Sequence, residues 1–454
     1  MQQKYSCYKI TIWFVIKMVR NNLSDEKPLV GFFPLSYSLA ETGRAVIIAK
    51  RFMELGGKVI FFTHGGEYEY LIKKIGCKII RVEPFFSEDF VKRIRSIIKG
   101  EKKEVLYNVE YLKEAIKNEV EAYKKSQVQF ILTTHNYSCC ISARVANIPL
   151  ISITTGPGRF KLSIPDMYEN FITRLIPQFL KIHVFNQIFP KAKNFLKPFN
   201  IVAKEYGLKP FKNIYQLYNG DITFVTNFLE FINIFPNQQE FPTDNYIGII
   251  FFDELFKNNF STGNNEIEED IIKHIKKSEK SILVTMGSSG DETLFIKILN
   301  TLNKIDYRVI AVYSNILKEN ELPKVHENIL LKKFVPSISQ LHKIVDLSII
   351  HGGQGTVFTA AYAGKPIIGF PMQYEQHLNL EKIVGHRSGL MLSKKYFNEK
   401  KLLNSIDEIF KNYNYFLENS QKLAKMLPKP EGDKKAAIKL LEIINKKPSK
   451  QLIN

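Results

Sequence analysis

Cysteine and long apolar runs are both scarce in this chain of 454 residues. It has only four cysteines and no Cys-x-x-Cys pair, which excludes a disulfide framework and the usual structural zinc signature. This scarcity predicts a reducing, cytoplasmic compartment. No apolar run reaches the ~18 residues of a membrane-spanning helix. The motifs G-x-G-x-x-G, G-x-x-x-x-G-K-[ST] and H-E-x-x-H are also missing, so three common kinds of nucleotide or zinc site are not indicated.

Acidic residues are outnumbered, 45 Asp+Glu against 64 Lys+Arg, for a net charge of +19. Such a surplus favours an anionic partner, which can be nucleic acid, a phosphorylated metabolite or an anionic membrane face. Nucleic acid is the weakest of these predictions, because no aromatic and basic motif of a known binding module is present. Residues 159–214 hold ten Lys+Arg against three Asp+Glu and are rich in Phe. They predict either an irregular helical excursion with solvated lysines or a lid or membrane-facing surface.

Short apolar runs alternate with helical patterns in two successive stretches of the chain. In the first stretch, strands are predicted at 29–35, 58–63, 78–82, 129–134, 150–155 and 221–227. In the second, they are predicted at 281–286, 307–313, 329–335, 346–350 and 365–371. Strands that alternate with helices form parallel sheets, so we predict an α/β chain of two doubly wound halves with a ligand cleft between them.

The domain organisation follows from where the pattern stops and restarts. We predict an N-terminal extension at 1–28, a first domain at 29–250 and a second domain at 251–425. Residues 426–454 are expected to form a C-terminal helix and tail, with the helix packing back on the N-terminal domain.

The chemistry concentrates where the predicted strand 346–350 runs into His351, Gly352, Gly353, Gln354, Gly355 and Thr356. Glycines allow a sharp turn that brings several N–H groups toward one point, and a helix begins there. The positive end of the helix dipole favours an anion at this place. The pattern is therefore consistent with phosphate binding, although a glycine turn between a strand and a helix is also common without a ligand.

A longer window resembles the signature of the family 1 and related UDP-sugar glycosyltransferases, which have the GT-B fold of two Rossmann-like domains. The signature reads H-G-G-x-G-T, then A-G-x-P, then P-x-x-x-[DE]-Q-x-x-N. The matching residues are His351, Gly352, Gly353, Gly355, Thr356, Gly364, Pro366, Pro371, Glu375, Gln376 and Asn379. Val335 lies in a segment similar to the family's base-binding segment, and Gly287 in one similar to its first phosphate-side loop.

The resemblance implies that the domain at 29–250 binds the acceptor and that the domain at 251–425 binds the nucleotide sugar. It also implies a role for each matched residue. His351 and the amides of Gly353, Gln354, Gly355 and Thr356 would hold the diphosphate, with Gly287, Ser288 and Ser289 across it. The backbone at Val335 would meet the uracil-like base, and Glu375 and Gln376 would bind the hydroxyls of the donor sugar. No metal and no cofactor is expected, because amides and the helix terminus stabilise the leaving diphosphate.

The sequence departs from the family at three positions. Thr359 stands where a glutamate usually binds the ribose hydroxyls, so it would offer one hydroxyl in place of a carboxylate. Arg44 stands where many members have the catalytic histidine, and arginine cannot act as a base. Arg44 is instead a candidate to bind an anionic acceptor or the diphosphate. Where the family has an orienting acid after the fourth strand, this chain has His135. We hypothesise that Glu41 and His135 meet across the cleft, one as the base and the other orienting it.

These features predict an inverting glycosyltransferase that moves a hexosyl group from a UDP-type nucleotide sugar to an acceptor hydroxyl. Two alternatives stay open: a nucleotide-sugar epimerase or hydrolase of the same fold, and a non-catalytic nucleotide-sugar-binding protein. The acceptor cannot be identified, but the basic, Phe-rich stretch 159–214 suggests a lipid at an anionic membrane surface. The expected location is the cytoplasm, either free or peripheral on the membrane.

Overall fold

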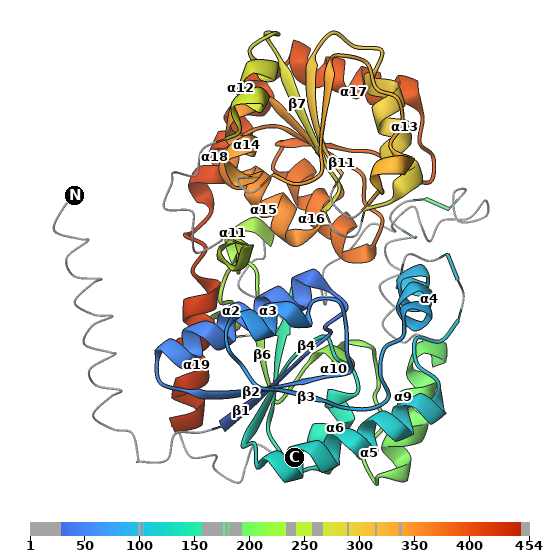
Figure 1. Ribbon diagram of the computed structural model, residues 1–454, viewed down its shortest axis with the longest axis vertical. Coiled ribbons are helices and arrows are strands. Elements are labelled where there is room, and N and C mark those ends of the chain that lie inside the picture. Colours follow the sequence, from blue (N-terminus) through green and yellow to red (C-terminus); the bar gives the residue numbers. More distant parts are fainter. Residues whose placement is uncertain are drawn as a thin grey trace, which may run out of the picture.

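Two parallel sheets of six strands each form the frame of the molecule, one above the other (Figure 1). The structure is a computed structural model, and it describes residues 29–98, 101–102, 104–156, 176–177, 180, 193–232, 242–256, 267–287, 290–313, 316–335 and 338–445. Every pairing of neighbouring strands is parallel. Helices cover both faces of each sheet, so the fold is the predicted α/β fold of two doubly wound halves.

The N-terminal half contains the sheet with order β3-β2-β1-β4-β5-β6. Its strands are β1 (Leu29–Pro34), β2 (Lys58–Thr63), β3 (Ile79–Arg81), β4 (Phe130–Thr134), β5 (Leu150–Thr154) and β6 (Ile222–Val225). Its helices are α2 (Leu39–Glu54), α3 (Glu69–Lys74), α4 (Glu88–Ile98), α5 (Val109–Ser126), α6 (Cys139–Val145), α9 (Lys193–Glu205), α10 (Tyr215–Tyr218) and α11 (Leu229–Ile232). Strands β4 and β5 are buried along their whole length, which explains their near-continuous apolar sequences.

The C-terminal half repeats this arrangement, with the order β9-β8-β7-β10-β11-β12 when its sheet is read from the other edge. Its strands are β7 (Ser281–Thr285), β8 (Arg308–Val312), β9 (Ile329–Lys332), β10 (Leu347–Ile350), β11 (Ile367–Gly369) and β12 (Gly389–Met391). Its helices are α12 (Glu269–Ile275), α13 (Glu292–Leu302), α14 (Ile338–Ile344), α15 (Gln354–Ala363), α16 (Tyr374–Gly385), α17 (Glu399–Lys411), α18 (Tyr413–Met426) and α19 (Gly432–Asn445). The described residues also contain the short 3-10 helices η4 (Thr243–Asn245), η5 (Asp253–Phe256) and η7 (Glu319–Glu321).

The two halves are joined by apolar packing and by the last helix. The ring centroids of Phe231 in α11 and Phe358 in α15 are 4.5 Å apart, inside a buried cluster that draws on both halves. Helix α19 leaves the C-terminal half and packs against α2, where Ala436 and Leu440 enter the core of the N-terminal half. The carboxylate of Asp433 accepts a hydrogen bond from Arg51 in α2 at 2.7 Å. These contacts fix one half relative to the other.

Some elements differ from the sequence predictions. Helix α2 begins at Leu39 and contains Gly43 in its interior. A Cβ atom at Gly43 would come within 2.7 Å of the Phe252 ring, so the glycine is there for a close approach and does not end the helix. Helix α4 and strand β12 were not predicted at all.

The N-terminal extension, and most of residues 159–192, lie outside the described part of the chain. Within residues 159–214, the described portion comprises 176–177, 180 and 193–214, which includes helix α9. None of the helices described by the structure has both the length and the apolar character to cross a membrane.

Candidate active site

Each sheet has one point at which the order of its strands reverses, and the candidate residues lie at these two points. The reversals fall between β1 and β4 in one half and between β7 and β10 in the other. In open parallel sheets, ligands bind outside the carboxyl ends of the strands at such a switch point. Glu41 and His135 follow β1 and β4, whereas Gly287 and His351 follow β7 and β10. The fold therefore presents one cluster from each half at a ligand-binding position.

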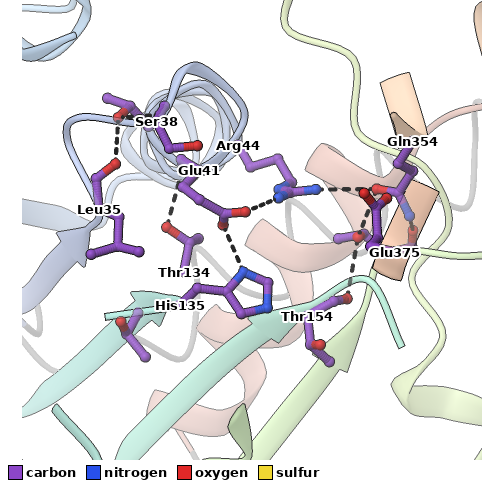
Figure 2. A network of polar contacts seen from close by, with 12 residues as sticks. Leu35, Ser38, Glu41, Arg44, Thr134, His135, Thr154, Gln354 and Glu375 are labelled. Atoms are coloured by element: carbon purple, nitrogen blue, oxygen red, sulfur yellow. Dashed lines mark hydrogen bonds and ion pairs between the residues drawn. The ribbon is translucent and has the colours of Figure 1, made fainter. Parts of the chain in front are cut away.

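Glu41 is held between Arg44 and His135 (Figure 2). One carboxylate oxygen accepts a hydrogen bond from the Arg44 guanidinium, and the other lies 3.0 Å from Nδ1 of His135. The three side chains are largely buried, with 12%, 7% and 15% of Glu41, Arg44 and His135 exposed. The structure thus brings together the two residues of the proposed pair. Their contact lies inside the N-terminal half, however, and not across the cleft as we expected from the sequence.

The backbone at His135 has a conformation that few residues other than glycine adopt. Its φ angle is 60°, in the left-handed region. The turn is held by the Asn136 N–H, which donates to Thr133 Oγ1 at 3.2 Å, and the neighbouring Thr134 hydroxyl donates to the Glu41 carbonyl at 3.1 Å. The imidazole and the Tyr218 ring pack edge to face, with ring centroids 5.4 Å apart. Residues held in sparsely populated conformations cluster at functional sites, so this one supports a functional role for His135.

The charges around Glu41 give Glu41 and His135 different chemical roles. Burial by itself would raise the pKa of Glu41, but the Arg44 charge and the His135 contact outweigh it and lower the pKa to about 2. The carboxylate therefore stays ionised near neutral pH, where it accepts hydrogen bonds well and protons poorly. Because Nδ1 of His135 lies 3.0 Å from Glu41, Nε2 is the ring nitrogen left to take a proton from a substrate.

Arg44 also reaches the C-terminal half. Its second terminal nitrogen donates to Oε1 of Gln354, the first residue of α15, at 3.1 Å. Gln354 in turn donates to the Thr226 carbonyl at 2.6 Å and accepts from the Thr226 hydroxyl at 3.2 Å. Both functional groups of the Gln354 side chain are thus engaged, so its predicted part in donor binding is left to its backbone amide.

The glycine-rich turn in the C-terminal half encloses a buried, neutral histidine. Burial lowers the pKa of His351 to about 4, and its Nδ1 has no hydrogen-bond partner among the described residues. The imidazole is packed so closely that a Cβ atom at Gly287 or Gly353 would lie 2.5 or 2.4 Å from the ring. The first hydrogen bond inside α15 is donated by Val357, so the preceding amides point outward without a partner in the helix. Free amides at the start of a helix are suited to bind an anion such as phosphate.

Several other predicted donor ligands are placed around this turn. Thr356 is half-buried in the first turn of α15, and the hydroxyl of Thr359 donates to the Gly355 carbonyl at 2.8 Å. Val335 follows β9 and is buried, while the adjacent Phe334 is 55% exposed. Ser288 and Ser289 lie outside the described residues.

The two residues predicted to bind the donor sugar, Glu375 and Gln376, lie in different surroundings. Burial raises the pKa of Glu375, while the Asn379 amide and the Arg44 charge oppose the rise. Asn379 donates to Glu375 at 2.7 Å and to the Gly352 carbonyl at 3.0 Å. Gln376, in contrast, is 1% exposed, and its side-chain oxygen accepts the Met372 N–H at 2.8 Å. In this conformation Gln376 shapes the loop before α16.

Sequence reasoning missed the residues that connect the clusters. Thr226 was not singled out, and Gln354 was expected to act through its backbone amide, with no contact predicted between its side chain and Arg44. The Arg44–Gln354 bond joins residues 310 positions apart, and no local pattern reports a contact over such a separation. In the part of the chain that the structure describes, no three His, Cys, Asp or Glu side chains are grouped to hold a metal ion. Metal-independent catalysis stays a prediction.

Comparisons with known proteins agree with this architecture. Residues 281–437 match the glycosyltransferase family 28 C-terminal domain. The uncharacterized UDP-glucosyltransferase YojK of Bacillus subtilis is 26% identical over 187 residues, which are 41% of this chain and 45% of that protein. A PGL/p-HBAD biosynthesis glycosyltransferase of Mycobacterium tuberculosis is 21% identical over 312 residues, 67% of this chain and 68% of that protein. The match to YojK thus spans less than half of the relative's length.

Solved glycosyltransferase structures share the fold over nearly the whole chain. The calicheamicin glycosyltransferase CalG4 superposes with a TM-score of 0.64 at 13% identity, over 93% of this chain and 100% of that one. A UDP-glucosyltransferase from Polygonum tinctorium gives 0.62 at 14% identity over the same shares of the two chains. At these identities the likeness shows the fold alone. The whole chain therefore has the GT-B fold, residues 281–437 match a glycosyltransferase domain, and the chain is similar to family 1-like UDP-sugar glycosyltransferases.

Proposed function

We propose that this protein is an inverting glycosyltransferase that moves a hexosyl group from a UDP-type nucleotide sugar to an acceptor hydroxyl, with His135 as the general base. The observation that carries the proposal is the ordered pair of Glu41 and His135 at the switch point of one sheet, coupled to a glycine-rich turn at the switch point of the other. Such a pair can take a proton from the acceptor, and such a turn can receive the leaving diphosphate.

The donor diphosphate would bind at the amino end of α15. The unpartnered Nδ1 of His351 and the outward amides of Gly355 and Thr356 are donors that match phosphate oxygens. Since the pKa of His351 is lowered to about 4, its ring is neutral near pH 7 and acts as a hydrogen-bond donor and not as a charge. The helix dipole adds a partial positive charge. This charge stabilises the diphosphate more strongly as negative charge develops on it during its departure.

The proposed step exchanges one bond at the anomeric carbon. The acceptor hydroxyl gives its proton to Nε2 of His135, and its oxygen attacks the anomeric carbon from the side opposite the diphosphate. The bond from that carbon to the diphosphate oxygen breaks, and the nucleoside diphosphate leaves with the electron pair. Glu41 stabilises the imidazolium that forms, because its carboxylate stays ionised beside Nδ1. Glu375, with its raised pKa, is the candidate to bind a hydroxyl of the donor sugar.

For the acceptor, we propose a lipid-linked or otherwise apolar alcohol or phenol. Two relatives carry names that point to glycolipids: the mycobacterial PGL/p-HBAD biosynthesis glycosyltransferase and human 2-hydroxyacylsphingosine 1-beta-galactosyltransferase. The latter is 21% identical over 237 residues, 51% of this chain and 41% of that protein. The basic, Phe-rich composition of residues 159–214 suits contact with an anionic membrane, and we propose a peripheral location there.

The transfer is tested by screening nucleotide sugars for thermal stabilisation and then analysing products by mass spectrometry. The reactions contain the stabilising donor with a lipid extract or with small phenols. We expect an acceptor that gains the mass of one hexosyl residue, together with free nucleoside diphosphate. Free sugar or a 2-epimer formed without an acceptor would contradict transfer and favour a hydrolase or an epimerase. Donor binding with no product in any mixture would favour a non-catalytic binding protein.

The membrane proposal has its own test, co-sedimentation with vesicles of neutral or anionic phospholipid. We expect binding to the anionic vesicles that weakens as salt is added, since the attraction is between charges. Equal, negligible binding to both kinds of vesicle would contradict a peripheral location.

A further inference from the structure

The bridge from Arg44 to Gln354 connects the proposed base to the proposed diphosphate site. His135 contacts Glu41, Glu41 contacts Arg44, and Arg44 contacts Gln354, where α15 begins (Figure 2). These residues come from α2, from the turn after β4 and from the start of α15, so the series crosses from one half to the other. Thr226 anchors the far end through two hydrogen bonds to the Gln354 amide.

The shape of the arginine side chain suits this connection. A guanidinium is planar and presents its donors as a rigid fork, so one terminal nitrogen can hold Glu41 while the other holds Gln354. The Arg44 side chain is 7% exposed, which leaves it little freedom to move. A lysine has one charged nitrogen on a flexible stem and cannot fix both partners in one geometry.

We propose that Arg44 is a positioning residue for the transfer, which fastens the Glu41–His135 pair to the amino end of α15. The inference rests on the proposed function. In it, Arg44 fixes the distance between His135, which accepts the proton, and the amides of α15 that receive the diphosphate. Reacting groups must be held in a narrow range of geometries, and small displacements of them lower the rate strongly.

The charge of Arg44 should affect the pH dependence of kcat/KM. The titratable or charged groups that face His135 are Glu41 and Arg44 from α2, Glu375 from α16, Tyr218 from α10 and the adjacent Tyr137. Removal of the Arg44 charge leaves Glu41 as the nearest ion, which favours the protonated imidazole. The acid limb of kcat/KM then moves to higher pH. A purely structural residue would not move it.

The test compares Arg44→Met, Arg44→Lys and Gln354→Met with the control Lys50→Met. Lys50 is a cation on the same helix, but its ion-pair partner is Glu254, at 2.7 Å in a part-buried contact. We measure kcat, the KM of donor and acceptor, the pH profile and the Kd of UDP for the full-length chain.

Arg44→Met should lower kcat by about 100-fold and move the acid limb to higher pH, with the Kd of UDP changed less than about threefold. Arg44→Lys and Gln354→Met should lower kcat by about tenfold without moving the acid limb, because the charges remain. In a double-mutant cycle, Arg44→Met and Gln354→Met together should lower kcat by a smaller factor than the product of their separate factors. Lys50→Met should match the wild type.

Two outcomes would overturn the proposal. If Arg44→Met and Gln354→Met both keep the wild-type kcat, the bridge does not position the base. If the affinity for UDP falls in parallel with kcat, these residues are donor ligands instead. Should Arg44→Met not fold, Gln354→Met decides, since it leaves every charge in place. A wild-type chain that transfers no sugar would instead sink the proposed function, so the two failures are distinguishable.

Discussion

One methyl group at Gly355 can separate the stability of α15 from its proposed part in diphosphate binding. Gly355 is the second residue of α15, it is exposed, and a Cβ atom there would meet no other atom within 4 Å. Gly385 offers a matched control at the end of α16, because a Cβ atom there also meets nothing within 4 Å. Neither glycine has the positive φ that would strain an alanine.

The magnitudes follow from this geometry. In a helix, alanine is favoured over glycine by up to about 1 kcal/mol, so Gly355→Ala and Gly385→Ala should both keep or raise the melting temperature, by at most ~2–4 °C. A methyl group at Gly355 would occupy space beside the outward amides and push a phosphate away from them. Loss of one hydrogen bond to a charged group costs about 1.5–3 kcal/mol, which corresponds to about a tenfold or greater increase in the Kd of UDP.

The assay combines thermal unfolding with calorimetric titration of UDP. We expect weakened binding for Gly355→Ala alone, with both variants at least as stable as the wild type. If Gly355→Ala binds UDP as tightly as the wild type does, the diphosphate does not lie on the amino end of α15 and the reasoning is refuted.

Two further predictions concern acid stability and ribose recognition. Burial lowers the pKa of His342 to about 3, so its stabilising contribution is complete above the unfolded value of about 6.5 and is lost as the pH falls toward 3. His342→Gln removes this titration. Between pH 7 and pH 4, its free energy of unfolding, measured with urea, should therefore fall by about 3 kcal/mol less than that of the wild type, and equal decreases would contradict this. The Thr359 hydroxyl donates its hydrogen bond to the Gly355 carbonyl and is not available to donate to a ribose hydroxyl. The wild type should therefore bind UDP and 2′-deoxy-UDP with Kd values within about threefold of each other. Thr359→Glu should favour UDP by about tenfold, and an unchanged ratio would show that the ribose lies elsewhere.

The strands and their order of appearance were predictable, because buried parallel strands read as uninterrupted apolar runs. Strand β2 at Lys58–Thr63 has the bounds that its sequence predicted. Helix α4 has a strongly amphipathic sequence and was missed although the signal was present. Strand β12 has three residues, which is too short for any periodicity to reveal.

The candidate site was predictable to the level of segments and not to the level of side chains. Motif spacing located the turn at His351, and the fold explains why Glu41 meets His135: their segments follow β1 and β4, which are neighbours in the sheet. The directions of Gln354 and Gln376 depended on partners that only the folded chain supplies, Thr226 and Met372. The contact of Glu41 with His135 is present in the structure, while its catalytic role stays a prediction.

The central chemical claim is that His135 takes the acceptor proton while Glu41 orients it. The most direct measurement is the transfer rate of the wild type, His135→Ala and Glu41→Gln at saturating donor, with UDP affinity measured on the same samples. The account predicts that His135→Ala loses about 10²–10⁴-fold in kcat and keeps its affinity for UDP, with a smaller loss for Glu41→Gln. Near-normal turnover in both variants, with donor binding intact, would contradict it.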